Sequence, residues 1–391
     1  MILYFLFELE EERTGMPISE EFKGCFSQLV DERVDRKKLY PLHEILFIVL
    51  CGSICGAGSW RDFVLFGEEK LEFLREHFPY SNGIPSKNTF ARVFAVLKAE
   101  EFRACFIDWV QGLQKRLEGV VAIDGKTLCN SHDKGIGQSA IHMVSAFATG
   151  VRLVLAQEKI EEKSNEITAI PKVLKLFEVR GNTITIDAVG CQKAIAEQIV
   201  EQQGDYVLAL KGNQGTLHYD VRLFLETEIA KPFSKAIESV YEASDAGHGR
   251  IETRKCIVSS QIDWLEQKPQ WAGLRTIAMI EETREVGEKM SIERRFFISS
   301  LPANASKIAH AVRSHWSVEN NLHWTLDVVF NEDQSRIRKD HAPENMAIVR
   351  HFTLNMLHNA QAAFKGVGIK ALRKKAGWGN ETLRTVLRQN F

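Results

Sequence analysis

Two short apolar segments that each end in an aspartate constrain this chain most. They span residues 119–126 and 183–187, and they carry Asp124 and Asp187. Short apolar runs bounded by turn residues are typical of buried strands, and a buried carboxylate is costly unless a cation meets it. The two acids are too far apart in sequence to belong to one hairpin. If the two strands are neighbours, both carboxylates lie at one edge of a sheet, which predicts a divalent-metal site made of carboxylates.

Length and composition set the broad class of the protein. At 391 residues the chain is too long for one ordinary core, so we expect two or three domains. With 45% hydrophobic and 26% charged residues it has the composition of a globular protein. The formal net charge of −1 gives no support to nucleic-acid binding, which must be argued from local patches. The seven scattered cysteines indicate reduced thiols of a cytosolic protein rather than disulfides.

No apolar stretch has the length of a membrane span. Residues 1–7 are apolar, but an acidic run follows them, whereas a signal peptide needs a basic start and a longer apolar core. The apolar stretch 45–50 also falls well short of the roughly 20 residues that a membrane helix needs. The sequence therefore predicts a cytoplasmic protein with no membrane partner.

The residue pattern changes several times along the chain. We expect a leader at 1–40, a helical N-terminal domain at 41–115, a mixed α/β segment at 118–214, a β-rich segment at 215–302 and a helical segment at 303–391. The first three strands of the mixed segment suit an antiparallel meander, and the later ones suit parallel additions through helical crossovers. The expected strands are 120–124, 141–147, 151–158, 183–187, 206–210, 237–242, 250–259, 274–283 and 292–300, with helices near 167–177 and 192–203.

A short helix after a proline-rich break is a candidate DNA-contacting element. Ser86 is a plausible N-cap, and Lys87, Asn88 and Arg92 crowd the first turns that follow it. This segment could be the second helix of a helix-turn-helix, with these side chains facing DNA. An ordinary surface helix is the alternative.

A third acid lies in the helical pattern near the C-terminal end. If 308–326 is one helix, Ile308, Val312, His315, Glu319, Leu322 and Leu326 share one narrow arc, so Glu319 is expected in the middle of the buried face. A lone buried glutamate requires a cation. The alternative is a structural salt bridge, to Arg313 or Arg336. Several further polar residues suggest a working surface: Arg313, His315, Trp316, Asn320, Asn321 and His323.

Five motifs together resemble a known family. They are Ala122-Ile123-Asp124-Gly125-Lys126, Lys163-Ser164-Asn165-Glu166-Ile167, Thr185-Ile186-Asp187-Ala188, Leu210-Lys211-Gly212-Asn213-Gln214 and Arg313-Ser314-His315-Trp316-Ser317-Val318-Glu319-Asn320. In combination they resemble the DDE transposases of bacterial insertion sequences, and among these the H-repeat-associated group. The resemblance covers nearly the whole chain from about residue 20 and includes the stretches 51–60 and 84–86.

The resemblance implies a fold and a catalytic triad. The fold would be α/β: an RNase H-like catalytic core, a mixed sheet with flanking helices, interrupted by a β-rich insertion and preceded by a helical N-terminal domain. Asp124, Asp187 and Glu319 would be the catalytic and metal-binding residues. Many relatives place a tyrosine, an arginine and a lysine around the glutamate where this chain has Val312, His315 and Leu326. The phosphate-binding roles of those residues therefore do not carry over to this chain. Arg313, His315 and His323 are candidates to bind phosphate in their place.

The chemistry of the proposed site requires hard cations. Phosphodiester cleavage builds charge on the attacking and leaving oxygens, and two Mg²⁺ ions stabilise both. Hard cations take oxygen ligands, which explains Asp and Glu rather than His or Cys. Mn²⁺ is expected to substitute for Mg²⁺. Asp124 would bridge the two ions, while Asp187 and Glu319 would each complete one.

Basic and polar residues near the expected site are candidates for DNA contact. Lys126, Lys193 and Lys211 each follow a predicted strand end closely, although solvated surface lysines are the alternative. The full candidate set is Lys126, Lys193, Lys211, Asn213, Arg313, His315, Trp316, Asn320, His323, Lys87 and Arg92. The C-terminal piece adds a basic excess typical of a phosphate-backbone footprint or of a merely solvated tail: Lys365, Lys370, Arg373, Lys374, Lys375, Arg384 and Arg388 against Glu381.

The sequence thus predicts an enzyme that acts on double-stranded DNA. The leading hypothesis is a transposase that cleaves insertion-sequence ends and joins them to target DNA, working as a homodimer on the element ends and target. An RNase H-like nuclease that cuts without joining is the second hypothesis. A transposase-derived DNA-binding protein without catalysis is the third.

Overall fold

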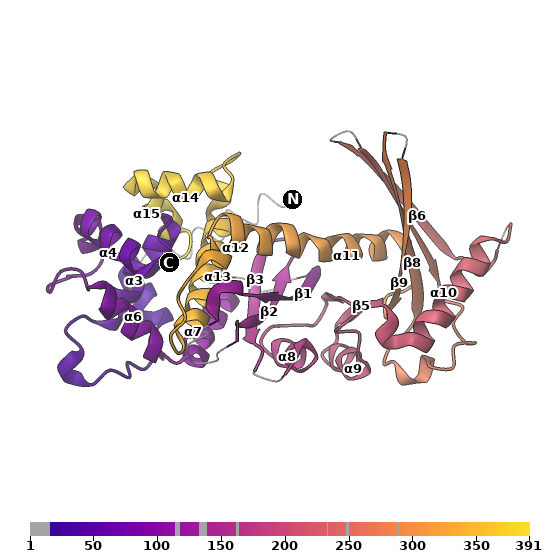
Figure 1. The fold of residues 1–391 in the computed structure, drawn as a ribbon, viewed down its shortest axis with the longest axis horizontal. Coiled ribbons are helices and arrows are strands. Elements are labelled where there is room, and N and C mark those ends of the chain that lie inside the picture. The colour runs from indigo at the N-terminus through magenta and orange to yellow at the C-terminus, as the bar shows by residue number, and fades with distance from the viewer. Residues whose placement is uncertain are drawn as a thin grey trace. The chain divides into compact units, whose positions relative to one another are not determined.

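The computed structural model describes residues 16–113, 118–132, 139–161, 164–232, 234–247, 250–287 and 289–391. Residues 1–15 of the expected leader and the motif residue Lys163 lie outside the described residues. Contacts divide the chain into two compact units (Figure 1). The first, the helical unit, comprises Met1–Gln114, Leu128–Ile141 and Thr325–Phe391. The second, the sheet unit, comprises Lys115–Thr127 and His142–Trp324.

The sheet unit begins with five strands in the arrangement that the sequence predicts. They are β1 (Val120–Thr127), β2 (His142–Ala148), β3 (Leu153–Lys159), β4 (Thr183–Ile186) and β5 (Asp205–Leu210), in the order β3-β2-β1-β4-β5. Strands β1, β2 and β3 pair antiparallel, whereas β4 pairs parallel with both β1 and β5. The mixed sheet expected of an RNase H-like core is therefore confirmed. Its near-continuous apolar strands are buried because helices cover both faces.

Four further strands extend the same sheet rather than forming a separate one. They are β6 (Ser239–Gly247), β7 (Arg250–Ser259), β8 (Thr276–Val286) and β9 (Lys289–Ser299). Strand β9 pairs antiparallel with β5, so the described strands form one nine-stranded sheet that ends at β6. The β-rich segment is confirmed, and the structure adds that it continues the core sheet. It also begins with a helix, α10 (Gly215–Ile229).

Helices lie on both faces of the core strands. Helices α8 (Glu166–Val173) and α9 (Lys193–Glu201) lie on one face, and α11 (Ala305–Val318) crosses the other (Figure 1). Helix α8 packs on β2 and β3, and α9 packs on β5. Helix α11 packs on β1, β4 and β5 and also on β6–β8. Because α11 carries the chain to Glu319, its packing decides where the third acid lies.

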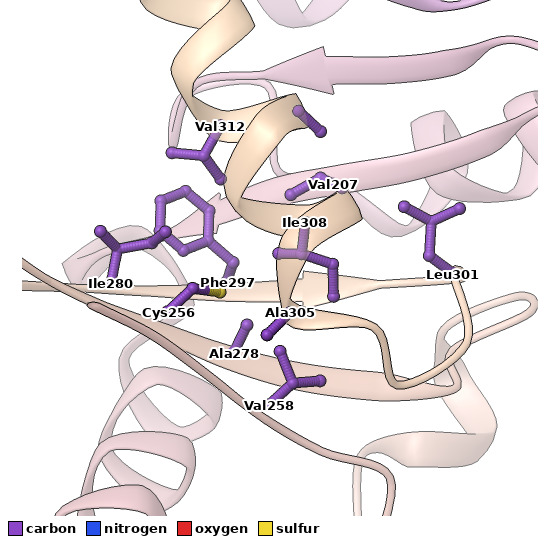
Figure 2. Packing of buried hydrophobic residues seen from close by; sticks show 11 residues of the cluster. Val207, Cys256, Val258, Ala278, Ile280, Phe297, Leu301, Ala305, Ile308 and Val312 are labelled. Atoms are coloured by element: carbon purple, nitrogen blue, oxygen red, sulfur yellow. The ribbon is translucent and has the colours of Figure 1, made fainter. Parts of the chain in front are cut away.

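A buried apolar cluster fixes α11 on the extended sheet. The helix contributes residues three or four positions apart to this cluster, which is the spacing of one helix face. Opposite them lie strand residues from β5, β7, β8 and β9 (Figure 2). The added strands therefore form the support of the helix that leads to Glu319. The cluster comprises Val207, Cys256, Val258, Ala278, Ile280, Phe297, Leu301, Ala305, Ile308, Ala311 and Val312.

The expected burial of Glu319 is wrong. Helix α11 ends at Val318, and the next five residues, Glu319–His323, form a π-helix before α12 (Trp324–Val328) begins. Glu319 is exposed, although Leu322 on the same face is buried as expected. The apolar cluster that covers this face of α11 ends at Val312, and Glu319 lies about two turns beyond it, near Asp124. The alternative of a salt bridge from Glu319 to Arg313 is not supported, because the Arg313 side chain pairs with Asp245 at 2.9 Å.

The helical unit is built around one buried helix, α13 (Ala342–Ala360). Helices α3, α6, α7, α14 and α15 all pack against it. Nearly all of its residues are buried, and the side-chain amide of Asn345 donates to the carbonyl oxygens of Phe94 and Leu97 at 2.9 and 2.8 Å. The other helices are α2 (Ile18–Cys25), α3 (Leu42–Ile54), α4 (Trp60–Glu69), α5 (Leu71–Arg75), α6 (Lys87–Val96), α7 (Ala99–Leu113), α14 (Ile369–Trp378) and α15 (Asn380–Arg388).

The basic C-terminal piece is not a uniform surface patch. Arg373 is buried, and its guanidinium donates to the carbonyl oxygen of Ser53. Arg384 donates to both carboxylate oxygens of Glu76. Arg373 is therefore enclosed within the helical unit and Arg384 is engaged in an ion pair, so both arginines help to hold the last helices in place.

Part of the expected leader is packed into the core, and the cysteines are reduced as expected. Phe22, inside the expected leader, is completely buried and packs edge-on against Phe47 of α3. All seven cysteines are free thiols. Within the described ranges, no helix combines the length and the hydropathy that crossing a membrane requires.

Candidate active site

The two aspartates lie at the same edge of the sheet. Strands β1 and β4 run parallel with Ile123 opposite Ile186, so Asp124 and Asp187 each come one residue after the last paired position. Parallel neighbours bring the same ends of their strands together, which is why two distant acids meet here. The sequence alone predicts this only if the two strands are adjacent, and the register shows that they are.

Asp124 is the most strongly perturbed acid of the site. Its pKa is raised to about 7, mainly by burial and also by the nearby carboxylates of Asp187, Glu166 and Glu319. The backbone N–H of Gly125 opposes this rise by donating to Asp124 Oδ1 at 2.9 Å. Three further acids thus lie near Asp124, and their negative charge disfavours its ionisation in the absence of a cation.

Asp187 is held by the backbone that follows it. Its Oδ1 accepts hydrogen bonds from the N–H groups of Val189 at 3.0 Å and Gly190 at 3.3 Å. An aspartate that binds the backbone two residues ahead forms a local turn and fixes its own carboxylate. Strand β4 is also tied to α11 two residues before Asp187, because Thr185 Oγ1 lies 3.1 Å from His315 Nδ1. Burial lowers the pKa of His315, while Asp187 opposes that shift.

The π-helix brings both Glu319 and His323 to the site. His323 Nδ1 lies 3.6 Å from Asp124 Oδ2. The pKa of His323 is lowered to about 4, mainly by burial and also by Lys126, His315 and His142. The imidazole is therefore neutral near pH 7, and its contact with Asp124 is not an ion pair. Its buried Nε2 has no hydrogen-bond partner among the residues that the structure describes.

Sequence reasoning missed Glu166 and His142 as site residues. His142 Nε2 lies 2.8 Å from Glu166 Oε1, and both side chains fill the space beside Gly125. A Cβ at position 125 would lie 2.1 Å from Glu166 Oε1 and 2.4 Å from His142 Nε2, so any larger residue there would displace both side chains. The signal for Glu166 was its presence in one of the five motifs. His142 had no signal, because a histidine at a strand start is common.

The donor atoms fit a hard cation better than a soft one. Asp124, Asp187, Glu319 and Glu166 offer only carboxylate oxygens, which Mg²⁺ and Mn²⁺ prefer. In the described part of the chain, no three His, Cys, Asp or Glu side chains stand close enough together to hold an ion. Holding one would therefore require the carboxylates to converge from these positions. A cation would relieve the repulsion that raises the pKa of Asp124.

The candidate lysines lie in different settings. Lys126 lies within β1 rather than beyond its end, and it is close enough to His323 to lower the pKa of that histidine. Lys193 begins α9, and its Nζ donates to the side chain of Gln270. Lys211 directly follows β5 and is exposed. Asn213 is also exposed, but its amide donates to the carbonyl oxygen of Ala188. This hydrogen bond links the loop after β5 to the loop after β4.

Three further candidates are exposed on α11 and on the π-helix that follows it. Arg313 is exposed and pairs with Asp245 of β6. The ring of Trp316 is 47% exposed, and the guanidinium of Arg295 lies 4.6 Å from its centroid. Asn320 is exposed in the π-helix beside Glu319.

The last two candidates belong to the helical unit. Ser86 caps α6, because its Oγ accepts from the N–H of Thr89 at 3.4 Å, as the sequence predicts. Lys87 and Arg92 are both exposed on this helix, while Phe90, Val93 and Phe94 form its buried side.

Comparison with known proteins decides the family. The family model described as "Transposase DDE domain" matches residues 115–356, and the model described as "DDE_Tnp_1-associated" matches residues 23–110. The chain belongs to the transposase DDE domain family. The matched range of this DDE family member contains Asp124, Asp187 and Glu319.

Two relatives of this DDE family member are similar over nearly its whole length. "Putative transposase YncI" of Escherichia coli O157:H7 is 41% identical over 366 residues, which cover 92% of this chain and 93% of that protein. "H repeat-associated putative transposase YhhI" of Escherichia coli (strain K12) is 40% identical over 367 residues, which cover 92% and 96%. The resemblance to the H-repeat-associated group is thus confirmed.

A solved structure also resembles the chain, but distantly. It is described as "Cryo-EM structure of piggyBac transposase synaptic complex with hairpin DNA (SNHP)" and aligns with a TM-score of 0.45 at 9% identity, covering 95% of this chain and 82% of that one. The family assignment rests on the sequence matches and not on this likeness.

Proposed function

We propose that this family member is a DNA transposase that cleaves insertion-sequence ends and transfers the cut strand into target DNA, with metal-dependent chemistry. The observation that carries the proposal is the parallel pairing of β1 and β4, which leaves Asp124 and Asp187 together at one sheet edge. Glu319, at the end of the helix packed across that face, would complete the triad. Family membership supports the same reaction class.

The reaction consists of two phosphoryl transfers. In the first, a water oxygen bonds to the phosphorus at the element end, and the 3′ oxygen leaves with a proton as a 3′-hydroxyl. In the second, that hydroxyl oxygen bonds to a target phosphorus and displaces the target's own 3′ oxygen. A pair of bound Mg²⁺ ions, or Mn²⁺ in their place, supplies electrostatic stabilisation of the attacking and leaving oxygens.

The protein's own residues would hold the ions and the DNA. Asp124, Asp187 and Glu319 are the proposed metal ligands, and the backbone N–H groups that fix Asp187 would limit how far it moves. Neutral His315 and His323 line the acids without adding positive charge near pH 7. Double-stranded DNA would contact the remaining candidates, and paired-end chemistry suggests a homodimer. The proposed DNA contacts are Lys126, Lys193, Lys211, Asn213, Arg313, His315, Trp316, Asn320, His323, Lys87 and Arg92.

The test is a cleavage and strand-joining assay on DNA that carries the element's own ends. We expect joined product from the wild type with Mg²⁺, and none from Asp187→Ala. The matched control is Asp263→Ala, because Asp263 is an exposed acid of the same unit that pairs with Lys268. Thermal unfolding measured at increasing Mg²⁺ concentrations tests metal binding without catalysis. A ligand that binds the folded state raises the unfolding temperature.

The outcomes separate the competing functions. Cut but unjoined DNA would indicate a nuclease, and DNA binding without cutting in any variant would indicate a binding protein that has lost catalysis. Equal product from wild type and Asp187→Ala would mean that the metal site lies elsewhere.

A further inference from the structure

Helix α14, labelled in Figure 1, carries a stripe of three exposed residues. Lys370, Lys374 and Trp378 are four residues apart, so they lie along one side of the helix, and all three are exposed. Trp378 is 80% exposed, more than any other large hydrophobic side chain in the described ranges. Tryptophan is usually well buried, so an indole held in water requires an explanation.

The opposite side of α14 is firmly anchored. Leu372 and Ala376 are completely buried. Arg373 donates to the carbonyl oxygen of Ser53 from Nε at 3.2 Å and from Nη2 at 2.7 Å, and its guanidinium lies 4.0 Å from the centroid of Phe330. The stripe therefore belongs to a fixed helix and not to a solvated tail.

The charge of the stripe is positive and not neutralised. Arg373 and Arg384 are engaged within the helical unit, but neither Lys370 nor Lys374 forms an ion pair with any residue in the described ranges. Two ammonium groups in line with an exposed aromatic ring suit a ligand that has regularly spaced anions and flat faces. DNA has both, as phosphates and bases.

We propose that Lys370, Lys374 and Trp378 form a DNA-binding site in which the lysines hold phosphates and the indole stacks on an unpaired base. The inference rests on the proposed function, because strand cleavage and joining produce DNA with unpaired bases. Element ends and target DNA share this chemistry, so the experiment must distinguish them.

The test measures binding without divalent cation, so that no cleavage is needed. Three probes are used: an intact duplex with the element's end, a forked duplex with the same end, and a forked duplex of unrelated sequence. Trp378→Ala should weaken binding to forked DNA about 5- to 150-fold, while Trp378→Phe should retain most of it. Lys370→Gln/Lys374→Gln should reduce the slope of log affinity against log salt by about 1.4 to 1.8. Lys175→Gln removes a single exposed lysine outside the stripe and serves as the control.

The results decide the inference independently of catalysis. If the stripe variants lose affinity only for the forked element end, the stripe binds that end. If they lose affinity for both forked duplexes, the stripe binds DNA from either source. Both results support the site. Unchanged affinity and salt slope in the stripe variants would overturn it, even if joined product forms. If Trp378→Ala sediments as a monomer where the wild type sediments as a dimer, and the salt dependence of DNA affinity is unchanged, the DNA-binding site is overturned. The stripe would then be an interface between two copies of the chain. An unchanged unfolding midpoint would confirm that the variants fold, as expected for exposed side chains.

Discussion

At the scale of single residues, Asp124 predicts a specific dependence of stability on pH. Its folded pKa, about 7, is above the ordinary 3.8, so the folded state binds this proton more tightly than the unfolded state does. The free energy of unfolding should therefore fall as pH rises from about 4 to about 7. Asp124→Asn cannot ionise, so in EDTA it should match the wild type at pH 4 and exceed it by about 1–3 kcal/mol at pH 8. Urea unfolding at several pH values measures the difference.

The same experiment contains its control. Asp263→Asn removes an exposed carboxylate whose pKa is lowered by Lys268, so it should gain no stability at pH 8. Adding Mg²⁺ at pH 8 should stabilise the wild type more than Asp124→Asn, because the variant has lost one of the three proposed carboxylate ligands. A difference between Asp124→Asn and the wild type that does not vary with pH would contradict the raised pKa.

The residues of the site differ in how far the sequence reveals them. Asp124 and Asp187 are visible because each ends an apolar strand, and the cost of burying a carboxylate demands a reason. Glu166 is invisible to that reasoning, since a glutamate at the first position of a helix is ordinary. Its proximity to Asp124 depends on the missing Cβ of Gly125, and only the folded backbone shows that approach.

At the scale of elements, the cluster under α11 predicts how firmly the third acid is supported. Ile308 is completely buried against the strands, whereas its neighbour Lys307 is exposed. Ile308→Ala should lower the free energy of unfolding by about 2–4 kcal/mol, because it leaves a cavity between helix and sheet. Lys307→Ala should change it by about 0.5 kcal/mol or less. Equal effects of the two substitutions in urea unfolding would show that the cluster does not anchor the helix.

The strands follow from the sequence better than the helix that ends at Glu319. The imperfect alternation of β-branched residues indicates the strands β6–β9, yet nothing in them tells that β9 pairs with β5. The helical wheel puts Glu319 on the face shared by Val312 and Leu322, which are both buried, but Glu319 is exposed. The apolar cluster under α11 ends at Val312, and a residue pattern does not encode where such packing stops.

At the scale of the whole molecule, chain order conceals which segments share a core. Helix α13 clusters with α3 and α7, although the entire sheet unit separates them in sequence. Its residues are buried all round, including Asn345 and Thr353, so it lacks the amphipathic pattern that identifies a helix face. Sequence reasoning can place the helix, but its partners depend on long-range packing.

A buried ion pair tests whether α13 is the centre of the helical unit. Arg350 Nη1 lies 3.1 Å from Glu332 Oε1, and these side chains are only 5% and 2% exposed. Removing one partner of a buried pair typically costs about 3–5 kcal/mol, so Arg350→Met should destabilise the unit strongly. Arg350→Met/Glu332→Gln should recover part of that loss, because it also removes the buried charge. Hydrogen exchange followed by mass spectrometry should show faster exchange in α13, α3 and α7 of Arg350→Met, with β1 and β4 unchanged. Faster exchange throughout β1 and β4 would instead show that the two units unfold together.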